Sequence, residues 1–216
     1  MEIDDIYSLF SKSSGISTDT RTINKKNLFF CLKGENFNGN SFINQAIDLG
    51  ASFVIYDEKK LYHKSEKTIK VKNALETLQL LAKYHRSKFK IPIIGLTGSN
   101  GKTTSKELIN SVLSQKFNVT CTSNNFNNHI GVPLTILEIN RKTDLAIIEM
   151  GANHLGEIDL LCSIADPNIG YITNFGKAHL EGFGGIEGVI KGKGELYEYI
   201  RQKKGVVLVN NDDSIQ

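Results

Sequence analysis

The sequence predicts an α/β protein in which a small mixed α/β domain, residues 1–88, precedes a parallel-sheet domain, residues 89–216. Two observations support this prediction. Beyond residue 92, short apolar segments alternate with longer helical segments, which is the pattern of a parallel sheet with helices on its faces. These apolar segments are continuous rather than alternating, as in strands that are covered on both faces. The pattern changes at 87–92, where we place the domain boundary.

The composition is that of an ordinary globular protein. The 216 residues carry 26 Lys and Arg against 23 Asp and Glu, a net charge of +3 that argues against a nucleic-acid partner. No apolar run approaches the roughly 18 residues of a membrane span, so we expect no membrane insertion. The acidic N-terminus lacks the pattern of a signal peptide. Cys31, Cys121 and Cys162 are odd in number and widely spaced, which predicts reduced thiols in a cytoplasmic protein.

The first domain is expected to mix helices and strands. Ile3, Ile6, Tyr7 and Phe10 recur at helical spacing, which predicts an N-terminal helix. Further helices are expected at 42–49, where Gly50 follows as a stop, and at 74–85; strands are expected at 28–32, 52–56 and 68–71.

The second domain is expected to carry five strands and three helices. The strands are predicted at 93–97, 119–122, 145–149, 170–173 and 206–209, and the helices at 103–117, 155–165 and 186–203. Ligands of such sheets bind beyond the carboxyl ends of the strands, and the polar motifs of this chain follow those ends. The last strand has no helix after it, so we expect the domain to be incomplete.

A glycine-rich loop follows the first of these strands and opens a helix. Residues 95–104 read GLTGSNGKTT, in which glycines let backbone N–H groups turn toward an anion at a helix N-terminus. Lys102 would reach the β- and γ-phosphates, and the Thr103 hydroxyl would meet Mg²⁺. Leu96 stands where the generic spacing has glycine, so the loop is a variant; the alternative is a glycine-rich helix start with an exposed lysine. The predicted nucleotide-binding residues are Gly98, Ser99, Asn100, Gly101, Lys102, Thr103 and Thr104. This motif predicts a domain of the phosphate-loop ATPase type.

Polar residues follow the other strands. Glu149 ends a predicted buried strand, where a carboxylate can hold Mg²⁺; otherwise it is a solvated acid. Asn174 and His179 follow the next strand and are candidates for the same site, although a lone histidine is commonly a surface or core residue. Asn128 belongs to an Asn-rich loop at 122–135 whose amides could donate to phosphate, the alternative being a turn with a helix N-terminus.

Seven glycines fall within residues 176–194. They predict a backbone near the site that is mobile or closely approached, the alternative being a loose surface loop. Lys191 and Lys193 lie in this stretch, and their chemistry alone indicates solvated lysines.

Together these residues resemble the Mur ligase family of cytoplasmic peptidoglycan synthesis. The resemblance is carried by residues 17–21, 28–39, 97–104, 125–135, 149–153, 174–184 and 193–197. It implies an N-terminal domain that binds a UDP-linked substrate, with Ser17, Thr18, Arg21 and Lys33 as binding residues. It also implies a carbamylated Lys193, whose anionic oxygens could hold a second Mg²⁺.

The resemblance further implies an ATP-dependent ligase that forms a peptide bond through an acyl phosphate. Residues 125–135, 149–153 and 174–184 look like the family member that joins D-alanyl-D-alanine to UDP-N-acetylmuramoyl-tripeptide. Its cofactors would be ATP and two Mg²⁺ ions, the first on Thr103 and Glu149, the second on His179 and carbamylated Lys193. The implied catalytic residues are Lys102, Glu149, His179 and Lys193.

One departure from the family leaves other functions open. The family's third, C-terminal domain is not found in this sequence, so the chain could be a truncated module that binds nucleotide or UDP-substrate without catalysis. A folylpolyglutamate synthetase-type ligase shares a similar phosphate loop and is the other alternative. That enzyme is not expected to carry residues 17–21 or the EMGAN run at 149–153.

Overall fold

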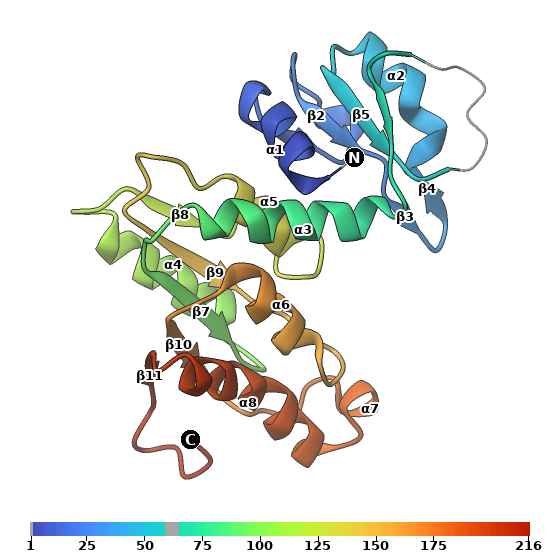
Figure 1. Cartoon of the computed structure of the whole chain (residues 1–216). Coiled ribbons are helices and arrows are strands. Elements are labelled where there is room, and N and C mark those ends of the chain that lie inside the picture. Colours follow the sequence, from blue (N-terminus) through green and yellow to red (C-terminus); the bar gives the residue numbers. More distant parts are fainter. Residues whose placement is uncertain (1, 59–64) are drawn as a thin grey trace. The chain divides into compact units, whose positions relative to one another are not determined.

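The computed structural model describes residues 2–58 and 65–216 and divides into two compact units, Met1–His85 and Arg86–Gln216 (Figure 1). The division falls within helix α3 (Ala74–Ser87), slightly before the boundary expected after residue 88. Within the described residues, none of the helices combines the length and apolar character that crossing a bilayer requires.

The first unit is built on a four-stranded parallel sheet with the strand order β1-β2-β5-β6. These strands are β1 (Ile16–Ser17), β2 (Leu28–Phe30), β5 (Phe53–Tyr56) and β6 (Thr68–Lys70). The remaining elements are α1 (Ile3–Lys12), α2 (Ile43–Asp48), α3, the 3₁₀ turns η1 (Thr20–Thr22) and η2 (Gly39–Phe42), and a hairpin of β3 (Lys33–Gly34) and β4 (Phe37–Asn38). The expected helices and strands are all present, whereas β1 and the hairpin were not anticipated.

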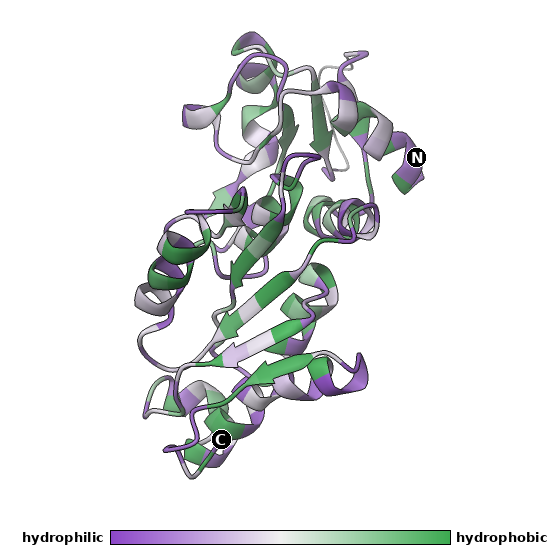
Figure 2. Cartoon of the chain, turned by 90° about the vertical axis from the view of Figure 1, so that its left-hand side faces the viewer, coloured by the Kyte–Doolittle hydropathy of each residue, from purple (hydrophilic) through white to green (hydrophobic). Residues whose placement is uncertain are grey.

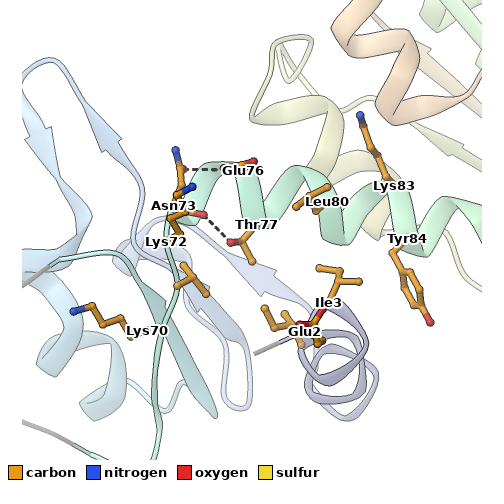
Figure 3. Close-up of a pocket in the computed structure, with 12 residues that line it drawn as sticks. Glu2, Ile3, Lys70, Lys72, Asn73, Glu76, Thr77, Leu80, Lys83 and Tyr84 are labelled. Atoms are coloured by element: carbon orange, nitrogen blue, oxygen red, sulfur yellow. Dashed lines mark hydrogen bonds between the residues drawn. The ribbon is translucent and has the colours of Figure 1, made fainter.

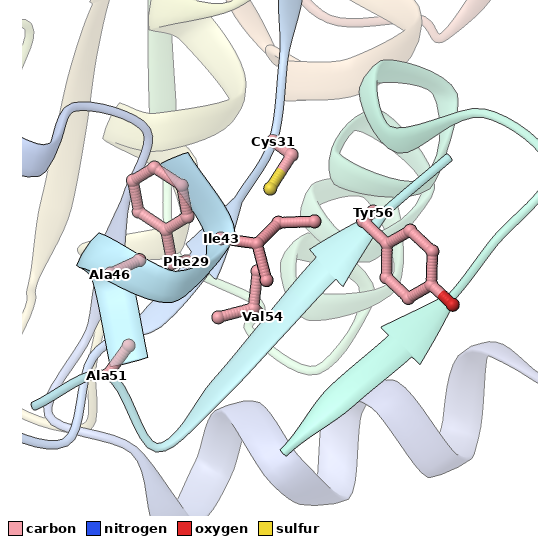
Figure 4. Packing of buried hydrophobic residues seen from close by; sticks show 7 residues of the cluster. All are labelled: Phe29, Cys31, Ile43, Ala46, Ala51, Val54 and Tyr56. Carbon is pink, nitrogen blue, oxygen red and sulfur yellow. The ribbon is translucent and has the colours of Figure 1, made fainter. Parts of the chain in front are cut away.

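A buried apolar cluster lies between this sheet and α2 (Figure 4). Phe29 of β2 and Val54 of β5 pack with Ile43 and Ala46 of α2, and Cys31 follows β2 in the same cluster. Since side chains alternate along a strand, Leu28, Phe30 and Ile55 point to the opposite face, and they are fully buried as well. The sheet is therefore covered on both faces, as its continuous apolar strands require.

The second unit is a five-stranded parallel sheet with the order β11-β10-β7-β9-β8. Its strands are β7 (Ile93–Thr97), β8 (Val119–Cys121), β9 (Leu145–Glu149), β10 (Ile169–Ile172) and β11 (Val206–Leu208). Its helices are α4 (Lys102–Leu113), α5 (Gly131–Leu137), α6 (Glu157–Ala165), α7 (Leu180–Phe183) and α8 (Ile186–Gln202). The predicted α/β class with a parallel sheet is confirmed, and hydrophobic strands alternate with helices of mixed hydropathy (Figure 2).

The topology of this sheet fixes where a ligand can bind. From the central β7 the chain passes through α4 to the edge strand β8, returns to β9, and then crosses to β10 and β11 on the other side of β7. Crossovers between parallel strands are right-handed, so the change of direction places α4 on one face and α6 and α8 on the other. The crevice at the carboxyl end of β7 is thus a topological switch point, the usual ligand site of such sheets.

Two stretches of the second unit contain more helix than a loop interpretation implies. The Asn-rich stretch at 122–135 ends in the turn and helix N-terminus that were its alternative, since the Asn128 side chain accepts from the backbone N–H groups of Ile130 and Gly131 at the start of α5. The glycines of 176–194 do not form one loop, since Gly188, Gly192 and Gly194 lie within α8. A Cβ atom on Gly188 or Gly192 would collide with Phe183, so the close approach expected of this stretch is present.

Lys106 of α4 is a buried lysine that the sequence analysis did not single out. It is 0% exposed, its Nζ donates to the backbone oxygen of Thr122 at 2.6 Å, and it pairs with Glu107 Oε1 at 2.8 Å. The ammonium therefore ties the helix that follows the glycine-rich loop to the end of β8.

We expect Lys106→Ala to lower the free energy of unfolding by about 2–4 kcal/mol, because it leaves a cavity and an unpaired buried carbonyl. Urea unfolding followed by far-ultraviolet circular dichroism measures the change. The exposed Lys116 provides the control, since Lys116→Ala should change stability by less than about 0.5 kcal/mol. Equal unfolding midpoints for the two variants would contradict this role of Lys106.

Candidate functional site

The glycine-rich loop connects the end of β7 to the start of α4 at the switch point. Gly101 precedes α4 with φ of 75°, a left-handed conformation that glycine adopts without strain. Gly98 lies so close to Thr173 that a Cβ atom would collide with its hydroxyl. The Lys102 Nζ folds back over the loop and donates to the backbone oxygens of Gly98 at 2.9 Å and Ser99 at 3.4 Å. Burial lowers the pKa of the Lys102 ammonium, and the nearby Glu149 carboxylate opposes this shift.

The segment after β10 supports the loop from the side. Asn174 accepts from the Asn100 N–H through Oδ1 and donates from Nδ2 to the Asn100 carbonyl, both at 3.1 Å. The Thr173 hydroxyl donates to the same carbonyl at 2.6 Å, and the Ser99 hydroxyl donates to Gly176 O at 2.8 Å. Asn174, predicted as a nucleotide ligand, thus uses its amide to hold the loop.

Glu149, at the carboxyl end of β9, lies beside the start of α4. The residue is 1% exposed; its Oε1 accepts from Asn127 Nδ2 at 2.8 Å and lies 3.4 Å from the Thr103 hydroxyl. Oε2 is buried and has no hydrogen-bond partner within the described part of the chain. Because a buried carboxylate oxygen without a partner is costly, this atom marks where a positively charged ligand fits.

Glu149 and Thr103 therefore offer the hard oxygen ligands that Mg²⁺ takes. Across residues 2–58 and 65–216, no group of three or more His, Cys, Asp or Glu side chains is gathered as a metal site. A cation at Glu149 would need further oxygen atoms, such as those of a nucleotide's phosphates.

A cavity of about 420 Å³ opens beside Lys102. Asn127, Asn128 and His179 also line it, together with residues 151–153. His179 immediately precedes α7, with φ of 53°. Because His179 is exposed and lines the cavity, its ring is available to a ligand there. The structure thus gathers Lys102, Asn128 and His179, which are far apart in sequence, around one space.

Lys193 lies in the middle of α8 and is 1% exposed, in contrast to the solvated lysine that its chemistry alone suggested. Its Nζ lies 5.3 Å from the centre of the Phe183 ring. Burial, with the positive charge of Lys102, lowers the pKa of Lys193 to about 8. Lys191 of the same helix is exposed.

The residues that follow Lys193 have structural partners. Glu195 accepts from the backbone N–H groups of Gly156 at 2.6 Å and Asp159 at 3.0 Å, which caps α6. The Tyr197 hydroxyl accepts from the Ile172 N–H and donates to Leu208 O, joining β10 to β11.

The predicted substrate residues belong to the first unit, at or beyond the carboxyl end of its sheet. Ser17 ends β1 and is buried, with its hydroxyl donating to Asp19 O at 2.8 Å; Thr18 follows it and is half-buried. Arg21 is exposed and pairs with the Asp19 carboxylate at 2.5 Å. Lys33 pairs with Asp57, the residue after β5, at 2.9 Å. Arg21 and Lys33 are thus cationic groups with carboxylate partners at this end of the sheet.

Another cavity, of about 770 Å³, belongs to the first unit and lies between α1 and α3 (Figure 3). Ile3, Ile6 and Leu80 supply apolar side chains, and Lys72 and Lys83 supply charge. None of the residues predicted as site residues lines this cavity, and it is not the candidate site.

The parallel sheet, the glycine-rich loop at its switch point and the carboxylate at the next strand end define a phosphate-loop nucleotide-binding protein. Comparison with known proteins identifies the family. The family description "Mur ligase middle domain" matches residues 96–216, and "Mur ligase family, catalytic domain" matches residues 12–86. The chain belongs to the Mur ligase family.

Similar proteins agree with this assignment. UDP-N-acetylmuramoyl-tripeptide–D-alanyl-D-alanine ligase of Bacillus subtilis (strain 168) is 39% identical, over 94% of this chain and 44% of the relative. The crystal structure of MurF from Acinetobacter baumannii has a TM-score of 0.84 at 36% identity and covers 92% of this chain and 44% of that one. MurF ligase from Thermotoga maritima, solved in complex with ADP, has a TM-score of 0.80 at 32% identity, with coverages of 92% and 46%. The chain thus spans less than half the length of these relatives, and the resemblance inferred from the sequence is confirmed.

Proposed function

We propose that this chain forms the nucleotide-binding and UDP-substrate-binding part of an ATP-dependent ligase that joins D-alanyl-D-alanine to UDP-N-acetylmuramoyl-tripeptide. The observation that carries the proposal is the arrangement of Glu149, Thr103 and Lys102 at the switch point. A buried carboxylate oxygen with no partner among the residues that the structure describes, a hydroxyl and a lysine ammonium converge there on the glycine-rich loop. These are the groups that bind a nucleoside triphosphate together with Mg²⁺.

Different residues would bind the phosphates and the two Mg²⁺ ions. Backbone N–H groups of 98–104 would surround the phosphates, and Lys102 would turn from the loop carbonyls to the β- and γ-phosphates. Thr103 and Glu149 would hold one Mg²⁺, and His179 with a carbamylated Lys193 would hold the second. The ions would supply positive charge against the phosphate oxygens. Asn128 would donate to phosphate oxygens from the amide nitrogen, since its Oδ1 caps α5.

The proposed reaction has two steps, phosphoryl transfer and amide formation. A carboxylate oxygen of the tripeptide attacks the γ-phosphorus of ATP, ADP leaves, and an acyl phosphate forms. The D-alanyl-D-alanine amine attacks the acyl carbon, loses a proton, and releases inorganic phosphate as the amide forms. Lys102 stabilises the negative charge that develops on the transferred phosphoryl group.

A cytoplasmic location is part of this proposal. The free cysteines Cys31, Cys121 and Cys162 support it, because disulfides are rare in the reducing cytoplasm.

Calorimetric titration with UDP-N-acetylmuramoyl-tripeptide, and with UDP for comparison, tests the substrate assignment. We expect the muramoyl-tripeptide to bind saturably and more tightly than UDP. We expect Arg21→Ala to weaken its binding by about tenfold, because arginine provides charge-assisted hydrogen bonds to phosphate or carboxylate. Lys25, an exposed residue of the same unit, is the control, and Lys25→Ala should bind like the unchanged chain. Absence of binding by a folded chain, both alone and at the length of its relatives, would refute the substrate class.

A nucleotide-binding module without turnover is the second candidate, and the coverage of the relatives favours it for this chain by itself. The measurement that separates the two is ATP turnover by this chain and by a protein of the relatives' length. Turnover in the longer protein alone would assign the chain a binding role.

A further inference from the structure

The Glu149 carboxylate accepts a shorter hydrogen bond from Asn127 than from the Thr103 hydroxyl. The Asn127 Nδ2 donates to Oε1 at 2.8 Å across 22 residues of sequence. A carboxylate only accepts, so the amide must present its NH₂ group to Glu149. One carboxylate oxygen is thereby occupied, and the other, Oε2, is the atom left without a partner in the described part of the chain.

The backbone around Asn127 is itself held in place. Its carbonyl oxygen accepts from the N–H of Gly151 at 2.7 Å, and its own N–H donates to Asn125 O at 2.7 Å. Gly151 lies two residues after Glu149, and a Cβ atom there would come within 2.9 Å of Asn127 Oδ1. A side chain at 151 would push the amide away, so glycine at this position lets Asn127 reach the carboxylate.

We propose that Asn127 is a positioning residue that fixes the orientation of Glu149, so that Oε2 is the oxygen presented to a divalent cation. The amide does this without adding charge, which leaves the full negative charge of the carboxylate for the cation. An alanine at 127 would leave Oε1 with the longer contact to the Thr103 hydroxyl, at 3.4 Å, and would hold the carboxylate less firmly. This inference rests on the proposed role of Glu149 as a Mg²⁺ ligand.

Calorimetric binding of ADP, with Mg²⁺ and with EDTA in place of the metal, tests the inference on the present chain. The quantity of interest is the gain in ADP affinity that Mg²⁺ provides. We expect Asn127→Ala to reduce this gain by about tenfold, within the 10–100-fold range for residues that support a metal ligand, and to leave ADP binding in EDTA unchanged.

The control is Asn125→Ala, an exposed asparagine of the same loop, which should keep the full gain. A general loss of structure would weaken ADP binding equally with and without metal; that result would overturn the inference, as would an unchanged gain in Asn127→Ala. Glu149→Gln separates the two proposals. If Glu149→Gln loses the gain while Asn127→Ala keeps it, only the role of Asn127 fails; if Glu149→Gln keeps the gain, the role of Glu149 itself fails.

Discussion

Lys102→Ala is expected to abolish ADP formation in a protein that carries this chain at the length of its relatives. Lys102 is the ammonium of the glycine-rich loop, and its Nζ is held by the backbone oxygens of Gly98 and Ser99 within reach of the phosphate site. Loss of one group that stabilises developing charge costs about 10²–10³ in rate, and loss of nucleotide affinity adds to this. A coupled assay of ADP release, started with the substrates proposed above, measures the effect.

Two comparisons make the Lys102 result specific. Lys102→Met keeps most of the side-chain volume and removes the charge, so it should be as inactive as Lys102→Ala. Lys116→Ala removes an exposed lysine shortly after the same helix and should leave the rate within about twofold, as expected of a surface change. Near-normal turnover by both Lys102 variants would remove the phosphate-loop interpretation.

Lys193→Ala is the second change with a large expected effect. Only a neutral amine reacts with CO₂, forming an N–C bond and losing a proton to give a carbamate. An ordinary lysine, with a pKa of 10.5, is almost wholly protonated near neutral pH, whereas the pKa of Lys193 is lowered to about 8. A large fraction of the Lys193 amine is therefore neutral near pH 8, and this reactive fraction rises as the pH increases through about 8. We expect Lys193→Ala to reduce turnover by about 10²-fold or more, with partial recovery in added acetate or formate.

The carbamate can also be detected without turnover. Carbon-13 magnetic resonance of the present chain in labelled bicarbonate should show a carbamate signal that strengthens as the pH rises toward 8. Lys193→Met should lack this signal, and Lys191→Ala, which changes an exposed lysine of the same helix, should keep it. Full activity of Lys193→Ala without added carboxylate, or an unchanged signal in Lys193→Met, would contradict the carbamate.

The candidate site differs from its sequence-based description in the partners of its asparagines. The sequence pointed to Asn128 and Asn174 as contacts for the nucleotide, and these remain proposals. In the structure Asn174 bonds the loop backbone at Asn100, and Asn128 caps α5. Asn127, which the sequence analysis passed over, is the residue bonded to Glu149. Three asparagines of similar chemistry lie close to the loop, and composition alone does not distinguish their roles.

The sequence by itself determined those features of this protein that depend on neighbours along the chain. Apolar runs and helical spacing predicted β7, β9 and α8 within a few residues, because secondary structure follows local periodicity. The glycine-rich loop was predicted because a strand, a turn and a helix start are all encoded within residues 93–104.

Only the tertiary structure decided the features that depend on the meeting of distant segments. The burial of Lys193 and Lys106, and the pairing of Asn127 with Glu149, arise where segments that are distant in the sequence pack together. Burial lowers the pKa of Lys193, and Asn127 bonds one oxygen of Glu149 while the other has no partner among residues 2–58 and 65–216. Desolvation and hydrogen bonding act through distances in space, and these are set by the packing of the sheet and its helices rather than by any local stretch of sequence.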